Sequence, residues 1–179
     1  MVGRLLGGLL DRVVLVAGTV AGGCLPGFVA QYRQRVGGRL DQVEIDLQPF
    51  RDIAARFHGG SLDALIQHHL RSADNTFRAE GQAIQAMVDS ETRLRSMFEA
   101  LQGSVFDQLV FLAAHGDRGI ARATWESFIP AFNLEASSIV VALTVGVALW
   151  LLFIGIWRGA SRLLSPVARR RRPTSRAAP

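Results

Sequence analysis

The uncharged stretch from Ile139 to Trp157 constrains this chain more than any other feature, because few places in a folded protein accept so long an apolar segment. At about 1.5 Å of rise per residue, a helix over this stretch would measure roughly 28 Å, close to the ~30 Å hydrocarbon core of a bilayer. We therefore expect a transmembrane helix over residues 139–157. A basic tail over residues 158–179 follows it, with seven arginines and no acid.

A second uncharged run covers residues 13–30, behind a short segment at residues 1–12 that ends in arginine. It is either an uncleaved first transmembrane helix or a signal sequence. The signal interpretation rests on Ala21–Cys24, which resembles the cleavage box of bacterial lipoproteins, where cleavage would leave Cys24 lipidated. The box usually carries a larger aliphatic residue in place of Ala21, and apolar side chains continue beyond Cys24. Both observations favour the uncleaved helix.

The positive charge of the chain is concentrated at its ends. The net charge of +5 and the pI of 11.1 are typical of nucleic-acid-binding proteins, yet residues 13–157 hold more acids than arginines. Arginines that flank an apolar run are retained on the cytoplasmic side, so we interpret the tail as the determinant of topology. Anionic lipid head groups are a compatible further contact, and we expect no nucleic-acid partner. The arginines given this role are Arg158, Arg162, Arg169, Arg170, Arg171 and Arg172.

Two membrane passages and a cytoplasmic C-terminus place the N-terminus in the cytoplasm as well. Residues 31–138 then form an external domain, which lies in the periplasm if the host is a Gram-negative bacterium. We accordingly predict a two-pass membrane protein with both termini in the cytoplasm.

Small residues in the first run have the spacing of a helix-packing face. Residues four apart share one face of a helix, and in lipid small side chains there let a second backbone approach closely. In the second run only Ala142 and Gly146 repeat the spacing. The alternative is that glycine is simply common in membrane helices. Pro26 is expected to kink or end the first helix. The predicted packing face consists of Gly18, Gly22, Gly23 and Gly27.

Residues 31–138 have helical patterns throughout, so we predict an all-α fold in which two transmembrane helices flank an extramembrane helical hairpin that resembles a coiled coil. Apolar side chains recur every three or four residues from Leu40, which is the pattern of a packing seam. Gly37 and Gly38 indicate a hinge before the seam, and Pro49 within it indicates a kink or a new helix start. The seam residues are Leu40, Val43, Leu47, Phe50, Ala54 and Phe57.

Start signals of further helices follow the seam. Ser61 is a good N-cap for a short helix over residues 62–71, and Asp74 begins a long helix that ends near Gln102. Glu91 interrupts the apolar stripe of this long helix. We expect the long helix to fold back on the seam as the second arm of an antiparallel hairpin.

The segment Val105–His115 is apolar nearly all round but too short to cross a bilayer. It lies either in the core of the domain, which we favour, or at the membrane surface. Asp117 is expected to cap a last helix that reaches Ile129 and stops at Pro130. Aromatic residues just before a membrane helix are typical of the membrane interface. Here they are Trp125, Phe128 and Phe132.

Three groups of short motifs stand out along the chain. They are Leu25-Pro26-Gly27-Phe28-Val29 with Gln31-Tyr32 and Gln34-Arg35, Gly37-Gly38 with Leu40-Asp41, and Arg122-Ala123-Thr124-Trp125 with Phe128 and Pro130. Together they resemble a family of small proteobacterial inner-membrane proteins that share a domain of unknown function. The resemblance spans nearly the whole chain. It implies a bacterial two-pass membrane protein and supplies no activity.

The sequence carries no catalytic constellation. It contains no lysine, which excludes Schiff-base and P-loop lysines, and Cys24 as the single cysteine excludes an internal disulfide. His68 and His69 are adjacent, so on a helix their rings point about 100° apart and do not easily chelate one ion. We expect no enzymatic activity, no cofactor and no metal site.

Two functions from different classes remain. The first is a structural or interaction protein, a scaffold or accessory subunit of an inner-membrane assembly, whose partners are membrane lipids and either other membrane proteins or further copies of the chain. The alternative is a lipid- or small-molecule-binding module, in which Val105–His115 and the nearby aromatic side chains form an apolar groove at the periplasmic membrane surface.

Overall fold

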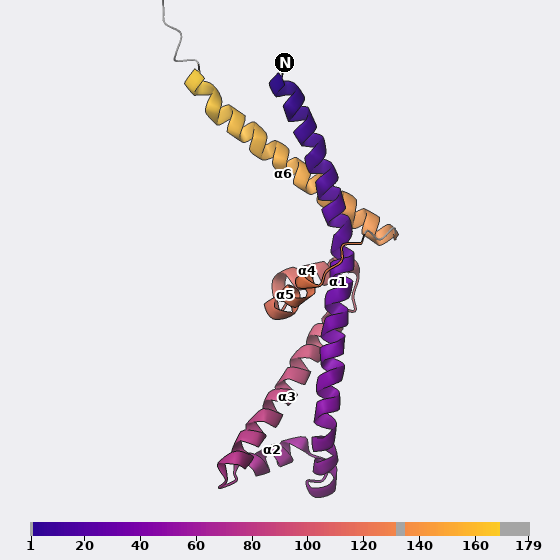
Figure 1. The fold of residues 1–179 in the computed structure, drawn as a ribbon, viewed down its shortest axis with the longest axis vertical. Coiled ribbons are helices and arrows are strands. Elements are labelled where there is room, and N and C mark those ends of the chain that lie inside the picture. Colours follow the sequence, from indigo (N-terminus) through magenta and orange to yellow (C-terminus); the bar gives the residue numbers. More distant parts are fainter. Residues whose placement is uncertain (1, 132–134, 169–179) are drawn as a thin grey trace, which may run out of the picture. The chain divides into compact units, whose positions relative to one another are not determined.

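A computed structural model describes residues 2–131 and 135–168, with side chains for residues 10–131, 135–136 and 138–159. The described residues form six α-helices and no strand, so the expected all-α class is confirmed (Figure 1). Two of these helices, α1 and α6, are long and apolar enough to cross a membrane. The helices are α1 (Val2–Phe57), α2 (Leu62–Leu70), α3 (Asn75–Ala100), α4 (Val105–His115), α5 (Arg118–Glu126) and α6 (Ala136–Ala168).

The longest helix, α1, runs unbroken through Pro26 and Pro49. Neither proline ends it, and α1 likewise continues through the expected hinge at Gly37-Gly38. A proline inside a helix costs about 3 kcal/mol or more, because it removes an amide donor and crowds the preceding turn. Burial offsets this cost here, since Pro26 is buried, and Leu47, two residues before the exposed Pro49, is fully buried.

The chain divides into two compact units, Met1–Gly27 with Pro130–Pro179 and Phe28–Ile129. The first contains α6 and the N-terminal part of α1; the second contains the rest of α1 and α2 to α5. The boundary falls inside the expected first membrane run of residues 13–30, and Val29 at the end of that run is fully buried in the core of the second unit. The apolar run therefore supplies part of the helical domain's core as well.

Two apolar clusters hold the second unit together, and in both of them side chains of α1 meet side chains of α3. Figure 1 shows α3 returning from α2 alongside α1. Because α1 presents one continuous apolar face, each shorter helix buries its own stripe against it. The first cluster contains Val29, Tyr32, Val36, Leu40, Leu94, Met97, Leu101 and Ile120. The second contains Leu47, Ile66 and Ile84.

The packed face of α1 contains five of the six residues of the predicted seam. Leu40, Leu47 and Ala54 are buried, and Val43 and Phe50 are half-buried and pack against the two clusters. Phe57 is the exception, with 75% of its surface exposed, because it is the last residue of α1 and the chain turns away after it. Gly59 and Gly60 make that turn with φ angles of 60° and 84°, a region that favours glycine.

Helices α2 and α3 begin at the predicted positions. Ser61 Oγ accepts a hydrogen bond from the backbone N–H of Ala64 at 3.1 Å, and Asp74 Oδ1 accepts one from Thr76 at 2.7 Å. Each bond satisfies an amide that lacks a partner within its own helix. The helix ends agree less well: α3 stops at Ala100 rather than near Gln102, and α5 stops at Glu126, before the expected Ile129.

The helix α4 has the predicted bounds and packs by one face. Leu109, Phe111 and Leu112 contact the first cluster, which agrees with the favoured core location. The opposite face stays exposed, at 48% for Phe106 and 69% for Val110. This exposed face is what makes the segment apolar nearly all round in sequence.

Candidate functional site

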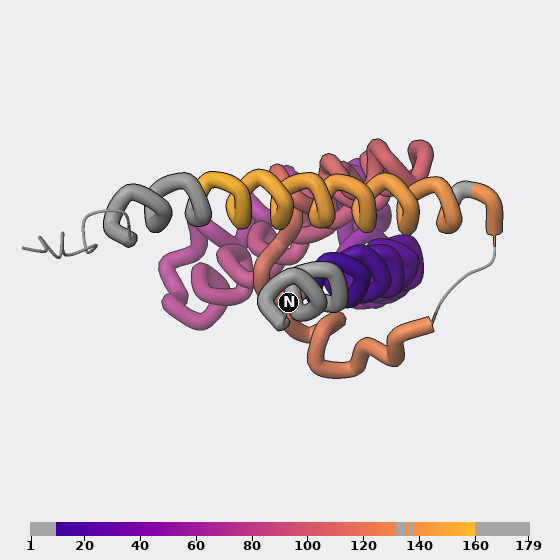
Figure 2. The backbone as a smooth tube through the Cα atoms, turned by 90° about the horizontal axis from the view of Figure 1, so that it is seen from above, coloured from indigo at the N-terminus to yellow at the C-terminus, as the bar shows by residue number. Residues whose placement is uncertain are grey.

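In the first unit, α6 crosses the N-terminal part of α1 through small residues (Figure 2), and the two helices run in opposite directions (Figure 1). A Cβ atom added at Gly18 would lie 3.3 Å from the Cα of Gly146, and one added at Gly22 would lie 3.1 Å from the Cα of Ala142. A Cβ at Gly146 would meet Thr19 Oγ1 at 2.2 Å and the Thr19 backbone nitrogen at 3.0 Å. No larger side chain fits without moving the backbones apart, so glycine sets the distance between the two helices.

The structure gives the four predicted packing glycines different surroundings. Gly18 and Gly22 face α6, where they meet the only matching small residues of the second run. Gly23 is buried, whereas the nearest atom to an added Cβ at Gly27 is the carbonyl oxygen of Ala131, at 3.5 Å. Gly27 thus does not take part in the contact with α6.

The arginines assigned to topology lie at and beyond the end of the described side chains. Arg158 is an exposed residue of α6. Arg162 belongs to α6 with its side chain outside the described residues, and Phe132 of the expected aromatic group also lies outside them. The remaining tail residues outside the described part are Arg169, Arg170, Arg171 and Arg172.

A polar contact joins the same two helices. Trp150 Nε1 donates a hydrogen bond to Asp11 Oδ1 at 2.5 Å. Trp150 belongs to the uncharged stretch between Ile139 and Trp157, so Asp11 lies level with the interior of that stretch. The sequence pattern places Asp11 outside the first run, because its charge ends the run. A carboxylate packed beside an apolar stretch is costly unless it is hydrogen-bonded, and the indole N–H of Trp150 supplies that bond.

Substituting Trp150 with phenylalanine is expected to weaken the pairing of α1 and α6. The variant keeps the aromatic bulk and loses the N–H donor, so Asp11 loses its hydrogen bond. Hydrogen bonds between membrane helices contribute about 0.6–1.7 kcal/mol, which should lower the midpoint of thermal unfolding in detergent. The matched control is Trp157→Phe, since Trp157 contacts Phe153 only through its ring. Equal midpoints for the two variants would show that the Asp11 bond contributes nothing.

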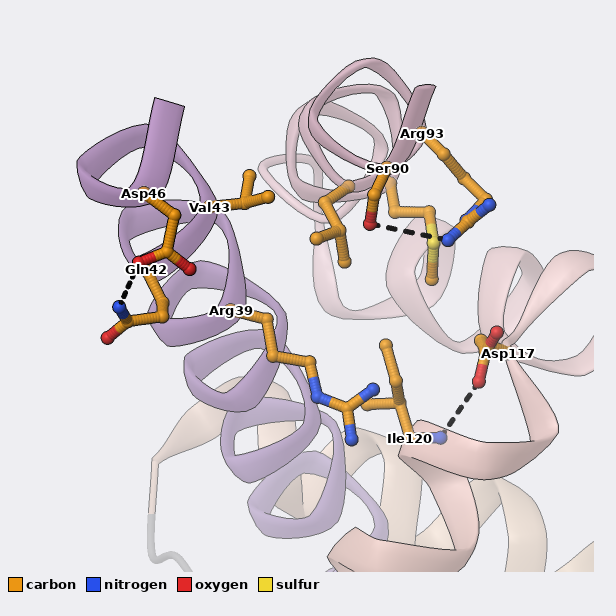
Figure 3. Close-up of a pocket in the computed structure, with 10 residues that line it drawn as sticks. Arg39, Gln42, Val43, Asp46, Ser90, Arg93, Asp117 and Ile120 are labelled. Carbon is orange, nitrogen blue, oxygen red and sulfur yellow. Dashed lines mark hydrogen bonds between the residues drawn. The ribbon is translucent and has the colours of Figure 1, made fainter. Parts of the chain in front are cut away.

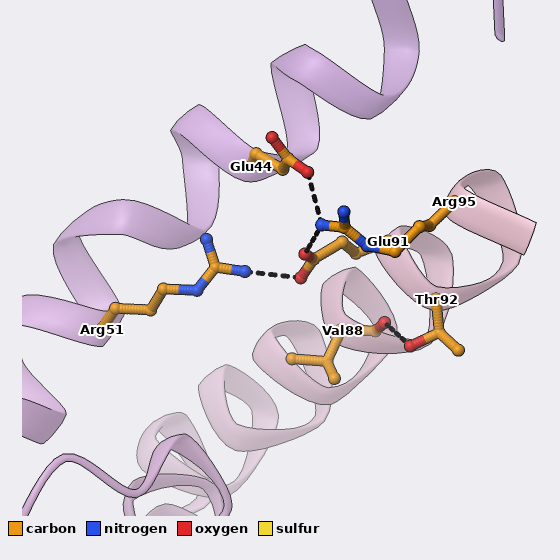
Figure 4. A network of polar contacts seen from close by, with 6 residues as sticks. All are labelled: Glu44, Arg51, Val88, Glu91, Thr92 and Arg95. Carbon is orange, nitrogen blue, oxygen red and sulfur yellow. Dashed lines mark hydrogen bonds and ion pairs between the residues drawn. The ribbon is translucent and has the colours of Figure 1, made fainter. Parts of the chain in front are cut away.

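In the second unit, a charged network links α1 to α3 (Figure 4). Glu91 accepts from Arg51 Nη2 at 2.6 Å and from Arg95 Nη2 at 2.8 Å, and Arg95 also reaches Glu44 at 2.5 Å. The Glu91 side chain is only 14% exposed, whereas Arg95 is half exposed. Burial alone raises the pKa of Glu91, but the hydrogen bond from Arg95 and the charge of Arg51 outweigh it and hold the pKa below its ordinary value. Glu91 is therefore the centre of an ionised cross-link between the two helices.

Motif residues that lie far apart in the sequence come together in the second unit. The Phe28 ring lies against Trp125 and Phe128, with centroids 6.1 Å and 5.4 Å apart. The buried Tyr32 accepts a hydrogen bond at its hydroxyl from the backbone N–H of Asp117 at 2.9 Å, just before α5. Trp125 remains 70% exposed. These contacts fix α5 against the part of α1 where the apolar run ends.

A cavity of about 250 Å³ lies between α1, α3 and the start of α5 (Figure 3). It is lined by side chains of both charges, Arg39, Asp46, Arg93 and Asp117, around an apolar floor. No pattern in the sequence marks it, because its residues come from three separate helices.

Three of the four histidines, His58, His68 and His69, lie close together around the turn between α1 and α2, whereas His115 stacks on Phe111 at the end of α4. The rings of His58 and His68 have centroids 5.3 Å apart, and His69 Nδ1 lies 2.9 Å from the carbonyl oxygen of Leu65. His69 Nε2 also lies 3.6 Å from a carboxylate oxygen of Glu80. Within the described residues, no group of three or more His, Cys, Asp or Glu side chains is placed to hold a metal ion. The free Cys24 is half-buried in α1.

A protein-family model matches most of the chain. The model of a family described as protein of unknown function, DUF2937, matches residues 6–165. The chain belongs to this family. No curated protein and no solved structure matches the chain. Membership of the DUF2937 family confirms the resemblance to a family of unknown function; the proteobacterial membrane setting stays a prediction.

Three contacts within the DUF2937 region escape prediction from the sequence. The pairing of Asp11 with Trp150 and the aromatic contact of Phe28 with Trp125 join residues far apart in the chain, so no local pattern records them. The Glu91 network has one signal in the sequence, which is that Glu91 interrupts an apolar helical stripe. An acid in such a stripe needs a partner when the stripe is buried. This signal identifies the acid but not the arginines that pair with it.

Proposed function

We propose that this protein is a membrane-anchored interaction protein, a scaffold or accessory subunit of an inner-membrane assembly. The observation that carries the proposal is the close antiparallel contact of the two apolar helices at Gly18, Gly22 and Gly146. Two helices of membrane-spanning length that pack through glycine are what a two-pass anchor needs, because lipid supplies no hydrophobic force to bring helices together. The remaining helices then serve as a domain held at one membrane face.

We infer further that both termini are cytoplasmic and that residues 31–138 are periplasmic. The arginine-rich segment after Trp157 supports this orientation, since it outweighs the sparse arginines just before the same run. The antiparallel course of α1 and α6 supports it as well, because antiparallel spans return the chain to the side from which it came.

Changing the tail arginines to glutamine is expected to disturb this orientation. In the unaltered chain, an alkaline phosphatase reporter fused at Asp89 should be active, as in the periplasm, and one fused at Ser175 inactive. With Arg158, Arg162 and Arg169 to Arg172 all replaced, the contrast should shrink or reverse. The control replaces exposed Arg56 and Arg71 in the domain and should leave the contrast intact. Reporters that keep the same sense in the tail variant would refute flanking charge as the determinant.

For the domain itself, we propose a helical hairpin of α1 and α3 with a coiled-coil-like seam. The burial of Leu40, Leu47 and Ala54 on one face of α1 supports it. Partner contacts would use the exposed apolar side chains of α1, which are Ile45 on the face away from the seam and Phe57 at the end of the helix, 65% and 75% exposed. Photo-crosslinking from these two positions in living cells should capture a membrane protein or a second copy of the chain. An absence of adducts at both positions, with expression intact, would argue against the scaffold role.

A second function, a lipid-binding module at the membrane surface, is favoured by the exposed apolar face of α4. Phe106 and Val110 stay exposed there, and Trp125 is exposed on α5. Purification in mild detergent separates the two functions. A protein partner in stoichiometric amount supports the scaffold, and retained lipid without a protein partner supports the lipid-binding module.

A further inference from the structure

The cavity between α1, α3 and the start of α5 has the composition of a small-molecule site. Its apolar lining comes from Leu94, Met97 and Ile120, which are all buried. Its volume of about 250 Å³ lies just below the roughly 300–1,000 Å³ typical of ligand pockets, so it suits a small molecule. All of its residues belong to the second unit, so its geometry is independent of how the anchor is oriented.

Two positive and two negative side chains line the cavity: Arg39 and Asp46 from α1, Arg93 from α3, and Asp117 before α5. The ion pairs that the described residues form include none between any two of these four groups. Opposite charges around one small cavity that do not neutralise one another leave both signs available to a ligand.

The two carboxylates are held in place by local N–H donors. Gln42 Nε2 donates to Asp46 Oδ1 at 2.8 Å, and the backbone N–H of Ile120 donates to Asp117 Oδ1 at 2.8 Å. A carboxylate accepts up to about four hydrogen bonds, so each of the two retains acceptor capacity. Both carboxylates are thus positioned without being saturated.

The two guanidinium groups are bound more loosely. Arg93 Nη2 reaches Ser90 Oγ only at 3.4 Å, and Arg39 makes no hydrogen bond within the described part of the chain. Figure 3 shows the Arg39 guanidinium extending toward Ile120, across the apolar lining. A guanidinium binds a carboxylate or phosphate through two parallel N–H bonds, so two such groups on facing helices can hold one oxyanion.

We propose that this cavity binds a small zwitterion that carries an oxyanion and a primary ammonium group, such as a phosphoethanolamine group or an α-amino acid. Arg39 and Arg93 bind the oxyanion, and Asp46 and Asp117, which lie on opposite sides of the cavity in Figure 3, offer two alternative positions for the ammonium group. The apolar lining takes the carbon part of the ligand. A simple anion is disfavoured by the two carboxylates and a simple cation by the two guanidinium groups, so the cavity selects for both charges together.

Isothermal titration of the full chain in a neutral maltoside detergent tests this assignment. The zwitterionic probes are glycerophosphoethanolamine, dihexanoyl phosphatidylethanolamine and leucine, which represent a free headgroup, a lipid and an amino acid. At least one should bind with a Kd below about 1 mM. Glycerophosphocholine keeps both charges but has no ammonium N–H, and glycerol 3-phosphate has only the anion. Both should bind about tenfold more weakly than the best zwitterion. Which zwitterion binds best identifies the source of the ligand.

Two double substitutions are expected to change the affinities for the zwitterion and for glycerol 3-phosphate in different ways. Asp46→Asn with Asp117→Asn keeps an N-cap at position 117 but removes both negative charges. This variant should bind the best zwitterion about tenfold or more weakly than the unaltered chain does, and it should bind glycerol 3-phosphate more tightly. Arg39→Gln with Arg93→Gln should weaken both probes about tenfold or more, because each loses charge-assisted hydrogen bonds.

The matched control, Arg56→Gln with Arg71→Gln, removes the same net charge from exposed positions outside the cavity and should change neither affinity. Circular dichroism melting of each variant verifies that the helices are retained. The proposal is overturned if no zwitterion binds the unaltered chain, or if the control loses as much affinity as the cavity variants. It is equally overturned if the asparagine variant weakens zwitterion and anion alike.

Discussion

Gly146→Leu is expected to push α1 and α6 apart. An added Cβ would lie 2.2 Å from Thr19 Oγ1, which could rotate, but also 3.0 Å from the Thr19 backbone nitrogen and 3.1 Å from its Cα, which could not. Overpacking of this kind costs about 1–3 kcal/mol, and the helix pair has no hydrophobic effect in lipid with which to compensate. The midpoint of thermal unfolding in detergent should fall accordingly.

The helix separation can be read directly by disulfide formation. An added Cβ at Gly18 would lie 3.4 Å from the Cβ of Leu149, close to the roughly 3.5–4.5 Å of a natural disulfide. Gly18→Cys with Leu149→Cys, on a Cys24→Ser background, should therefore crosslink under oxidant in membranes. Protease cleavage between the helices, followed by a non-reducing gel, reports the yield. Adding Gly146→Leu should reduce this yield severalfold.

The control for Gly146→Leu is available on the same helix. A Cβ added at Gly155 meets no atom within 4 Å, so Gly155→Leu should leave both the unfolding midpoint and the crosslink unchanged. If the two leucine variants behave alike, the glycine contact does not hold the helices together, and the proposed anchor loses its principal support.

Glu91→Ala is expected to destabilise the second unit by about 1–3 kcal/mol, since hydrogen bonds to charged groups contribute about 1.5–3 kcal/mol and solvent screening at half-exposed arginines reduces that contribution. The variant leaves Arg51 without its partner on α3 and removes one of the two partners of Arg95. Chemical unfolding followed by circular dichroism measures the loss. The control is Glu126→Ala, whose pair with Arg122 is 61% and 83% exposed and should contribute only about 0.3–0.5 kcal/mol.

The same carboxylate makes stability depend on pH. Its folded pKa lies below the ordinary value of 4.5, so its contribution is fully present above pH 4.5 and is lost as the pH falls through the lower folded value. The unaltered chain should therefore lose stability in that acid window, and Glu91→Ala should lose less over the same window. Parallel pH profiles would contradict an ionised Glu91 at the centre of the network.

Much of the local structure follows from the sequence because it depends on short-range chemistry. Ser61 and Asp74 cap their helices as predicted, since the side-chain oxygen and the amide it accepts from lie within three residues of each other. The bounds of Val105–His115 were equally predictable, because Gly103-Ser104 breaks the pattern before it and Gly116 follows its end. The all-α class follows from the helical spacing of the apolar residues.

The prolines show where local reasoning fails. Pro26 and Pro49 carry a strong local signal to kink or end a helix, and α1 continues through both. Burial of the flanking face decides the outcome, since Val29, Tyr32 and Leu47 are fully buried against other helices. That energy comes from residues far away in the chain, so no local window contains it.

The glycine contact of the first unit can be recognised in the sequence, whereas the cavity of the second unit cannot. The spacing of Gly18 and Gly22 and of Ala142 and Gly146 is visible in the sequence, and it identified both faces of the contact in the first unit. The cavity is not visible, because Arg39, Arg93 and Asp117 belong to three different elements and each is unremarkable in its own segment.

The sequence by itself determined the all-α type of the fold, the two runs long enough to cross a membrane, and the charge asymmetry around the second run. Those properties depend on composition and on spacing within a few turns. Only the tertiary structure decided that Asp11 pairs with Trp150, that Glu91 joins α1 to α3, and that four unpaired charges line one cavity. These depend on which side chains meet across helices, and that is set by the burial of whole faces rather than by neighbours in the chain.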